Sequence, residues 1–235
     1  MIAILLACSG LPDTILVTGT VTDAPKGQGS AVEGATVTSL DEDGLVARDP
    51  TPRDEATTYE DGSFVVEAVA GEDFFLTVSK DGYVPTSWSG SAGFVDLYTG
   101  DGVPWIAEEA WVEALRDELP DCVAEGAVVT GEVRQLIDGL DYDELPIVAL
   151  GAVTVTDADG ARHEACYFDD EGVADPDATH VGETGRFAVF GLPEGPLVVE
   201  VTIDDPAYTS VFAQYRYRAV EGGLVPMFPA LLRGL

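Results

Sequence analysis

The feature of this sequence that most constrains its fold is an internal repeat, in which five short segments recur in the same order in both halves of the chain. VTGTV at residues 17–21 matches VTGEV at 129–133, and DGSFVV at 61–66 matches TGRFAV at 184–189. The other matching pairs are 33–38 with 150–156, 41–44 with 157–160, and 75–83 with 197–208. Chance similarity between short β segments does not give an ordered set of this length. The sequence therefore predicts one folding unit that occurs twice.

The repeated segments have the patterns of short strands and tight turns. VTGTV and VTGEV alternate apolar and polar residues, as strands with one buried face do, and their central glycines predict a bulge or a close neighbouring backbone. The Asp-x-Asp-Gly segments at 41–44 and 157–160 are typical of turns. Phe64 and Phe187 each follow a turn glycine by two residues, which predicts that they point into a core. These patterns predict an all-β chain with two tandem antiparallel β-sandwich modules.

One segment, residues 103–119, departs from the strand pattern. Its apolar residues recur near helical intervals at Trp105, Val112, Leu115 and Leu119. Pro104 suits a first helical turn and Pro120 ends a helix. We expect a short amphipathic helix between the modules, with its tryptophans packed against the body of the protein. The predicted organisation is a leader over 1–8, module 1 over 14–100, a linker over 101–125, and module 2 over 126–235 with an acidic insertion at 161–183.

The first copy of the repeat resembles a carboxypeptidase regulatory-like domain, a small transthyretin-like sandwich. The segments that carry the resemblance are VTGTVTD at 17–23, EGATVT at 33–38, TTYEDGSF at 57–64 and LTVSKDGY at 76–83. The second copy is similar over roughly 126–220, but Thr184 stands where the first has an aspartate before the turn glycine. The resemblance implies seven or eight antiparallel strands and no catalytic residues. Such modules act as folding aids, spacers or binding platforms.

The net charge of −32, from 43 acidic and 11 basic residues, limits the partners of this chain. Such a surface repels nucleic acid and anionic lipid headgroups, and attracts divalent cations or basic proteins. An acidic, lysine-poor surface is typical of exported proteins, and a halophilic source gives the same composition. We expect no nucleic-acid partner.

The first ten residues, MIAILLACSG, resemble the end of a bacterial lipoprotein leader, with Cys8 as the cysteine that is acylated. This predicts a lipid-anchored protein of the bacterial cell envelope, facing the periplasm or the exterior. The segment departs from the pattern because it lacks Lys and Arg and its apolar run is short. The alternative is a short apolar leader with an ordinary core cysteine. No apolar stretch reaches the ~18 residues of a transmembrane helix.

Cys122 and Cys166 remain once Cys8 is assigned to the anchor. In an oxidising compartment they form either a disulfide or two separate buried thiols. Neither lies in a CxxC motif or a zinc-ligand spacing. His163 is close to Cys166 in sequence, but the surrounding acids would raise the pKa of a thiol there. HExxH and GxSxG are both absent, so we expect no enzyme.

The acidic insertion is the one segment that suggests a metal. Its carboxylates, hard oxygen ligands of the kind calcium prefers, are those of Asp169, Asp170, Glu171, Asp175 and Asp177. Their spacing is not that of an EF-hand, and acid-rich loops are more often solvated turns. Zinc bound through His163, His180 and an acidic residue is a weaker alternative. No cofactor other than calcium is suggested.

An aromatic surface is the candidate for a protein or glycan partner. It consists of Trp88, Tyr215 and Tyr217, and the two tyrosines alternate with Arg216 and Arg218. Strand geometry puts the tyrosines on one face and the arginines on the other. The alternative is a core-facing strand with a solvated arginine face.

Taken with the repeat and Cys8, these features predict a non-catalytic lipoprotein that acts as a spacer, adhesion or binding platform. The alternatives are a calcium-dependent glycan- or protein-binding module and an accessory subunit of a hydrolase.

Overall fold

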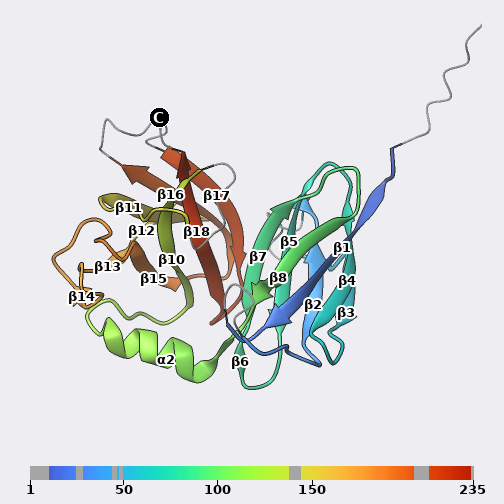
Figure 1. Cartoon of the computed structure of the whole chain (residues 1–235), viewed down its shortest axis with the longest axis horizontal. Coiled ribbons are helices and arrows are strands. Elements are labelled where there is room, and N and C mark those ends of the chain that lie inside the picture. Colours follow the sequence, from blue (N-terminus) through green and yellow to red (C-terminus); the bar gives the residue numbers. More distant parts are fainter. Residues whose placement is uncertain are drawn as a thin grey trace, which may run out of the picture.

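The computed structural model describes residues 11–24, 29–43, 47, 50–137, 144–203 and 212–233. These residues form mostly strands, and helix α2 occupies Glu109–Glu118 (Figure 1). The strands build two sandwich modules that lie side by side, and α2 packs against the second. The predicted all-β class is therefore confirmed.

Module 1 is a sandwich of a three-stranded and a four-stranded layer. The first layer has the order β4-β1-β8, formed by Ser63–Val69, Thr14–Thr22 and Leu97–Trp105. The second has the order β3-β2-β5-β7, formed by Asp54–Thr57, Thr36–Leu40, Asp73–Ser79 and Thr86–Ser91. Val17, Phe64 and Leu76 belong to one buried cluster between the layers. The alternation of apolar residues along each strand thus puts one face of each layer into the core.

Module 2 repeats this topology. Its layers have the orders β15-β10-β18 and β12-β11-β16-β17. The strands are β10 (Ala127–Leu136), β11 (Gly151–Asp157), β12 (Arg162–Glu164), β15 (Arg186–Leu192), β16 (Gly195–Ile203), β17 (Phe212–Ala219) and β18 (Leu224–Arg233). Gly19 opposes Phe64 in module 1, and Gly131 opposes Phe187 in module 2. Matching segments of the repeat therefore occupy matching positions, and both phenylalanines are buried as predicted.

Each sandwich is mainly antiparallel, as predicted, and also contains one parallel pair of strands. The last strand of each module, β8 or β18, runs parallel to the first, β1 or β10. The pairing of β1 with β8 shifts register on both sides of Thr20, the first shift falling at Gly19, and the pairing of β10 with β18 shifts directly after Gly131. A Cβ on Gly19 would meet Thr99, and one on Gly131 would meet the carbonyl of Met227. The VTGxV glycines are thus needed where the neighbouring backbone comes close.

The two modules share one sheet. Strand β18 of module 2 pairs with β7 of module 1 through Leu224 and Thr86, which joins five strands of module 2 to four of module 1 in a nine-stranded sheet. Each module still closes its own buried cluster. A third cluster lies between the modules and contains residues of both, including Val84, Trp105 and Leu224. Each module therefore has a core of its own, and a third buried cluster connects the two modules.

Helix α2 is shorter than predicted and begins later. Trp105 is still part of β8, where it pairs with Thr22 of β1. Two short paired strands, β6 (Tyr83–Val84) and β9 (Ala107–Glu108), precede the helix. Residues 103–108 are extended because their backbone groups pair with the end of β1 and with strand β6. A helical segment could not form these pairs, since its backbone groups bond within the helix.

The apolar stripe of α2 faces module 2 as its spacing predicted. Val112, Leu115 and Leu119 are buried against Val128 and Phe190 of that module's sheet. Trp105 is buried in β8, and its ring meets that of Trp111 edge-on at 5.6 Å. No helix in the described part of the chain is long and apolar enough to cross a bilayer.

The acidic insertion of module 2 adds two strands to the sheet. Strand β13 (Cys166–Phe168) pairs with β15, and β14 (Ala174–Asp175) pairs with β13. A disulfide joins Cys166 to Cys122, which follows α2 in the chain, so one of the two predicted alternatives for these cysteines is present. The bond fixes the segment after α2 to strand β13 of the sheet.

Candidate binding cleft between the modules

A cleft with a volume of about 300 Å³ lies where β7 of module 1 meets β17 of module 2. Its lining comes from three strands: Asp73 and Phe75 of β5; Ser89, Gly90 and Ser91 of β7; and Gln214, Tyr215 and Arg216 of β17. The lining is mostly polar, and it includes no histidine or cysteine among the residues that the structure describes. Because both modules contribute, the cleft exists only in the assembled pair.

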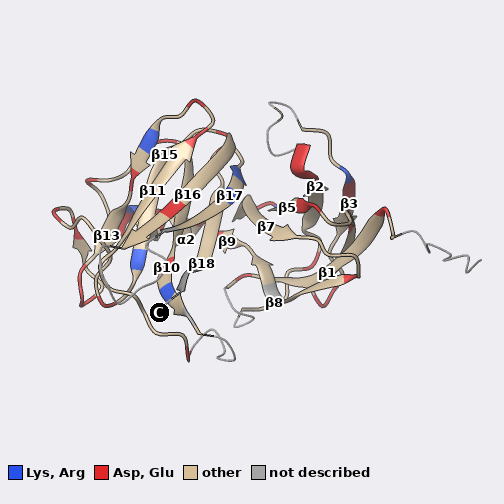
Figure 2. Ribbon diagram, turned by 90° about the horizontal axis from the view of Figure 1, so that it is seen from above, with Lys and Arg blue, Asp and Glu red and all other residues tan. Residues whose placement is uncertain are grey.

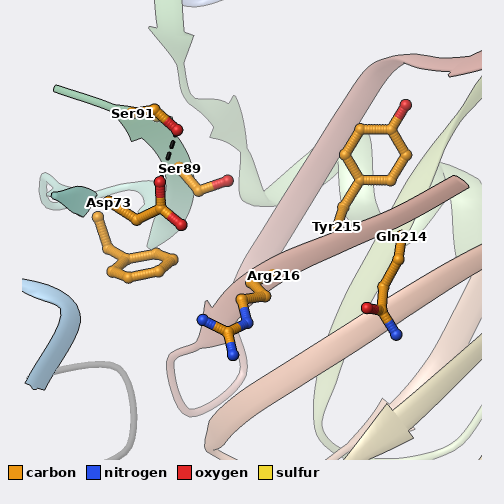
Figure 3. A pocket seen from close by; sticks show the side chains of 8 residues that line it. Asp73, Ser89, Ser91, Gln214, Tyr215 and Arg216 are labelled. Atoms are coloured by element: carbon orange, nitrogen blue, oxygen red, sulfur yellow. Dashed lines mark hydrogen bonds between the residues drawn. The ribbon is translucent and has the colours of Figure 1, made fainter. Parts of the chain in front are cut away.

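Asp73 and Ser91 form the polar wall on the module 1 side (Figure 3). They are register partners on β5 and β7, and the Ser91 hydroxyl donates to Asp73 Oδ1 at 2.6 Å. The bond fixes the direction of the carboxylate. A hydroxyl beside a carboxylate is not an activated nucleophile, because no histidine is present in the lining to accept its proton. The pair is suited to hydrogen bonding with a ligand.

Arg216 projects from β17 towards the Asp73 side of the cleft (Figure 3). Its Nη1 donates to Glu42 Oε1 of module 1 at 3.0 Å, and both side chains are about half exposed, at 54% and 49%. An exposed ion pair of this kind contributes little stability, typically ~0–1 kcal/mol. The guanidinium of Arg216 can therefore exchange Glu42 for a ligand with little loss of stability.

Arg218 and Tyr217 are buried residues of β17 that bond to module 1. Arg218 is only 2% exposed, and its Nη1 donates to the carbonyl of Ala47 in module 1 at 2.7 Å. Tyr217 is 8% exposed and shares a side-chain hydrogen bond with Ser89 of β7. Burial is the main cause that raises the pKa of Tyr217, with the nearby Tyr215 second. Figure 2 shows the basic segment of β17 at the edge of module 2 that faces module 1.

The predicted aromatic partner surface is wrong for Tyr217, which is buried in the core cluster of module 2, as the alternative of a core-facing strand predicted. Trp88 is half-buried against the core of module 1, where its ring lies 5.8 Å from that of Phe74. Tyr215 is half-buried against the core of module 2 and points away from Asp73 in Figure 3. The solvated arginine face is also wrong in part, since Arg218 is buried. The three aromatic residues do not form one open platform, because the junction of the modules separates them.

Three of the five carboxylates predicted for calcium accept backbone hydrogen bonds within the acidic insertion. Asp169 Oδ1 accepts the N–H groups of Glu171 and Val173 at 3.0 and 2.7 Å. Asp170 and Asp175 likewise accept backbone N–H groups, those of Glu183 at 2.8 Å and of Asp177 at 3.0 Å. Within the ranges that the structure describes, no group of three or more His, Cys, Asp or Glu residues could hold a metal ion. Calcium binding therefore remains a prediction from the sequence.

The other sequence candidates lie away from the cleft. Cys166 is bonded to Cys122, so it is not a free thiol beside His163. His163 Nε2 lies 2.9 Å from Asp157 Oδ2 instead, and this contact is the main cause that holds the pKa of Asp157 below its usual value. His180 is exposed. Cys8 lies outside the described residues.

Sequence reasoning missed the polar residues of the cleft, among them Asp73, Ser89, Ser91 and Gln214. A weak signal was available, because Ser89 and Ser91 alternate along one strand face. Their partners on β17 lie more than a hundred residues away in the chain, and nothing local indicates that the strands meet.

The chain matches no protein-family profile and no curated protein sequence. Among solved structures it is similar to the TIE protein of Bacillus anthracis, at 12% identity over 94% of this chain and 34% of that one, with a TM-score of 0.29. It is also similar to the shaft pilin SpaA of Lactobacillus rhamnosus GG, at 12% identity over 95% and 98% of the two chains and a TM-score of 0.29.

A third match is 3-chlorocatechol 1,2-dioxygenase of Rhodococcus opacus 1CP, at 14% identity over 34% of this chain and 44% of that one, with a TM-score of 0.26. The chain spans about a third of the length of the TIE protein. At such TM-scores these likenesses carry no argument about function.

Proposed function

We propose that this chain is a non-catalytic, exported lipoprotein of the bacterial cell envelope, in which two sandwich modules form one rigid spacer and binding platform. The observation that carries the proposal is the junction between the modules. Small, polar contacts between domains allow relative motion, whereas buried apolar contacts prevent it. Here a shared apolar cluster, a buried arginine and a continuous sheet all connect the two modules.

The equivalent registers of the two modules support the assignment of both copies to the transthyretin-like, carboxypeptidase regulatory-like group. In each copy the VTGxV glycine opposes a buried phenylalanine and faces a parallel last strand. Modules of that group serve as spacers or binding platforms, which is the role we propose here.

The proposed lipid anchor determines how far each module lies from the membrane. Cys8 lies six residues before Thr14, where β1 begins, so an acylated Cys8 holds module 1 within about 20 Å of the membrane surface. Strand β1 starts at the end of module 1 that lies away from module 2 (Figure 1). Module 2 is then the part held farther from the anchor.

Two measurements test this proposal. Labelled palmitate should be incorporated into the wild-type protein and not into Cys8→Ala; equal labelling of both would refute the anchor. Small-angle scattering of the Cys8→Ala protein should fit one arrangement of the modules. Arg218→Ala should broaden the distribution, because Ala47 loses the buried donor that fixes its position. Arg162→Ala, at an arginine that is 73% exposed and pairs within module 2 with Glu200, is the matched control. A wild-type ensemble as broad as that of Arg218→Ala would contradict the rigid platform.

The cleft favours a second, compatible role, the binding of a hydroxyl-rich ligand such as an oligosaccharide. Asp73, Gln214 and Arg216 offer acceptors and donors from opposite walls, which is how binding sites orient sugars. Saturation-transfer NMR against a panel of oligosaccharides should detect binding that Asp73→Asn abolishes and Glu113→Gln, an exposed change on α2, leaves intact. Loss of binding with EDTA would instead indicate the calcium-dependent module.

A further inference from the structure

Four large apolar side chains are exposed at one end of module 1. Leu11 is 65% exposed, Leu16 42%, Phe94 49% and Val95 76%. We refer to these four residues as the N-terminal tip. Single exposed apolar residues are ordinary, but several gathered at one place indicate a contact surface.

Backbone hydrogen bonds hold the segments of the N-terminal tip together. Ala70 N–H donates to the carbonyl of Asp13 at 3.1 Å, and Gly71 N–H donates to that of Gly93 at 3.0 Å. These bonds tie the segment before β1 and the β7–β8 connection to the same turn.

Side chains complete the arrangement. The Asp96 carboxylate accepts Leu16 N–H at 2.9 Å. The Phe94 ring lies over Gly71, where a Cβ would be only 2.9 Å from its Cζ atom. The aromatic ring is therefore held outward on an ordered loop.

We propose that the N-terminal tip contacts the interfacial layer of the bilayer that holds the acylated Cys8. The inference rests on the proposed lipid anchor. Only two residues separate Cys8 from Leu11, a reach of about 10 Å for an extended chain. The start of β1 lies at the end of module 1 opposite module 2 (Figure 1). The anchor therefore keeps the tip at the membrane surface, where a weak contact becomes effective because it is intramolecular.

The charges beside the tip decide which lipids it suits. Asp13, Glu72 and Asp96 lie on the same connected segments, and all three are acidic. Anionic headgroups would be repelled, so the contact is apolar and favours zwitterionic lipid. Burial of Phe94 and Val95 in the interface supplies the attraction. The contact would fix the orientation of module 1 on the membrane and so the direction in which module 2 points.

The test uses the lipidated chain in phosphatidylcholine vesicles, with a polarity-sensitive fluorophore on a single added cysteine. Val95→Cys carries the label at the tip. Val173→Cys, at a valine 61% exposed in module 2, is the matched control. The label attaches to one site because Cys8 is acylated and Cys122 and Cys166 are bonded to each other. Brominated lipid should quench the label at 95 at least about threefold more than the label at 173.

A second measurement uses the Cys8→Ser protein, which lacks the anchor. Its partition into phosphatidylcholine vesicles should fall about tenfold on Phe94→Ser, since half of an aromatic ring no longer enters the interface. Its partition into phosphatidylglycerol vesicles should be weaker and should rise with salt.

The outcomes separate the tip from the anchor. If the wild-type protein does not float with vesicles, the anchor itself is wrong. If the protein floats but the labels at 95 and 173 are quenched equally, the anchor stands and the tip contact is refuted. A label at 95 that is shielded in the Cys8→Ser protein without vesicles, increasingly so with protein concentration, would show that the tip binds a second copy instead. That result also overturns the proposal.

Discussion

Replacing Leu115 tests how much the packing of α2 stabilises the junction of the two modules. Its side chain lies in the buried cluster that both modules share. It is 3% exposed and packs among Val128, Phe190 and Leu224 of module 2 and Trp105 of module 1. Replacing it by alanine removes three buried carbon atoms and leaves a cavity. Changes of this kind cost ~2–5 kcal/mol, with the smaller values where the surroundings can collapse.

We expect Leu115→Ala to lower the free energy of unfolding by about 2–3 kcal/mol, because a surface helix can settle towards the space that the side chain leaves. For a chain of this length the melting temperature should fall by about 5–10 °C. Calorimetry and urea unfolding give the two quantities. Wild type should unfold in one transition, since the shared cluster couples the modules.

The matched control is Glu113→Ala, an exposed change two residues earlier on the same helix. It should alter stability by less than about 0.5 kcal/mol. The packing argument is refuted if Leu115→Ala costs no more than this control. Two separate transitions in the wild type, with only one of them shifted by Leu115→Ala, would refute the coupling of the modules.

Three further predictions concern single contacts. Replacing Cys122 and Cys166 by serine should cost up to about 4 kcal/mol in urea unfolding, from the 44-residue separation that the disulfide closes; equal stability of the oxidised and reduced wild type would contradict this. The contact with His163 lowers the folded-state pKa of Asp157, so its stabilisation is complete above the unfolded pKa of about 3.9 and is lost as pH falls through the folded value. The stability difference between wild type and Asp157→Asn should therefore shrink from pH 6 to pH 3, and a constant difference would oppose this assignment. Gly131→Ala should destabilise by more than about 2 kcal/mol, because its Cβ meets the β18 backbone, and a near-neutral change in thermal melts would refute that close approach.

Helix α2 shows what the local sequence pattern predicts correctly and what it does not. Val112, Leu115 and Leu119 are buried as their spacing predicted. The beginning of the helix was predicted too early, because Pro104 and Trp105 suit a first helical turn as well as they suit a strand. The pairing of Trp105 with Thr22 decides between them, and that pairing joins residues far apart in the chain.

The tyrosines and arginines of β17 show the same limit. Alternation correctly placed Tyr215 and Tyr217 on one strand face and Arg216 and Arg218 on the other, but not what each face meets. Arg218 lies within reach of the Ala47 carbonyl only because module 1 packs against β17. A solvated arginine and one buried at an interface have the same sequence signal.

The sequence by itself determined the repeated unit, the inward phenylalanines and the glycines of VTGxV, because residue alternation and turn chemistry act over a few neighbouring positions. Only the tertiary structure decided that β18 adds to β7, that the modules share a third core, and that a cleft opens between β7 and β17. These features depend on how two outer faces fit together. Faces of that kind have no period along the chain, so their partners become visible only when both modules are folded and in contact.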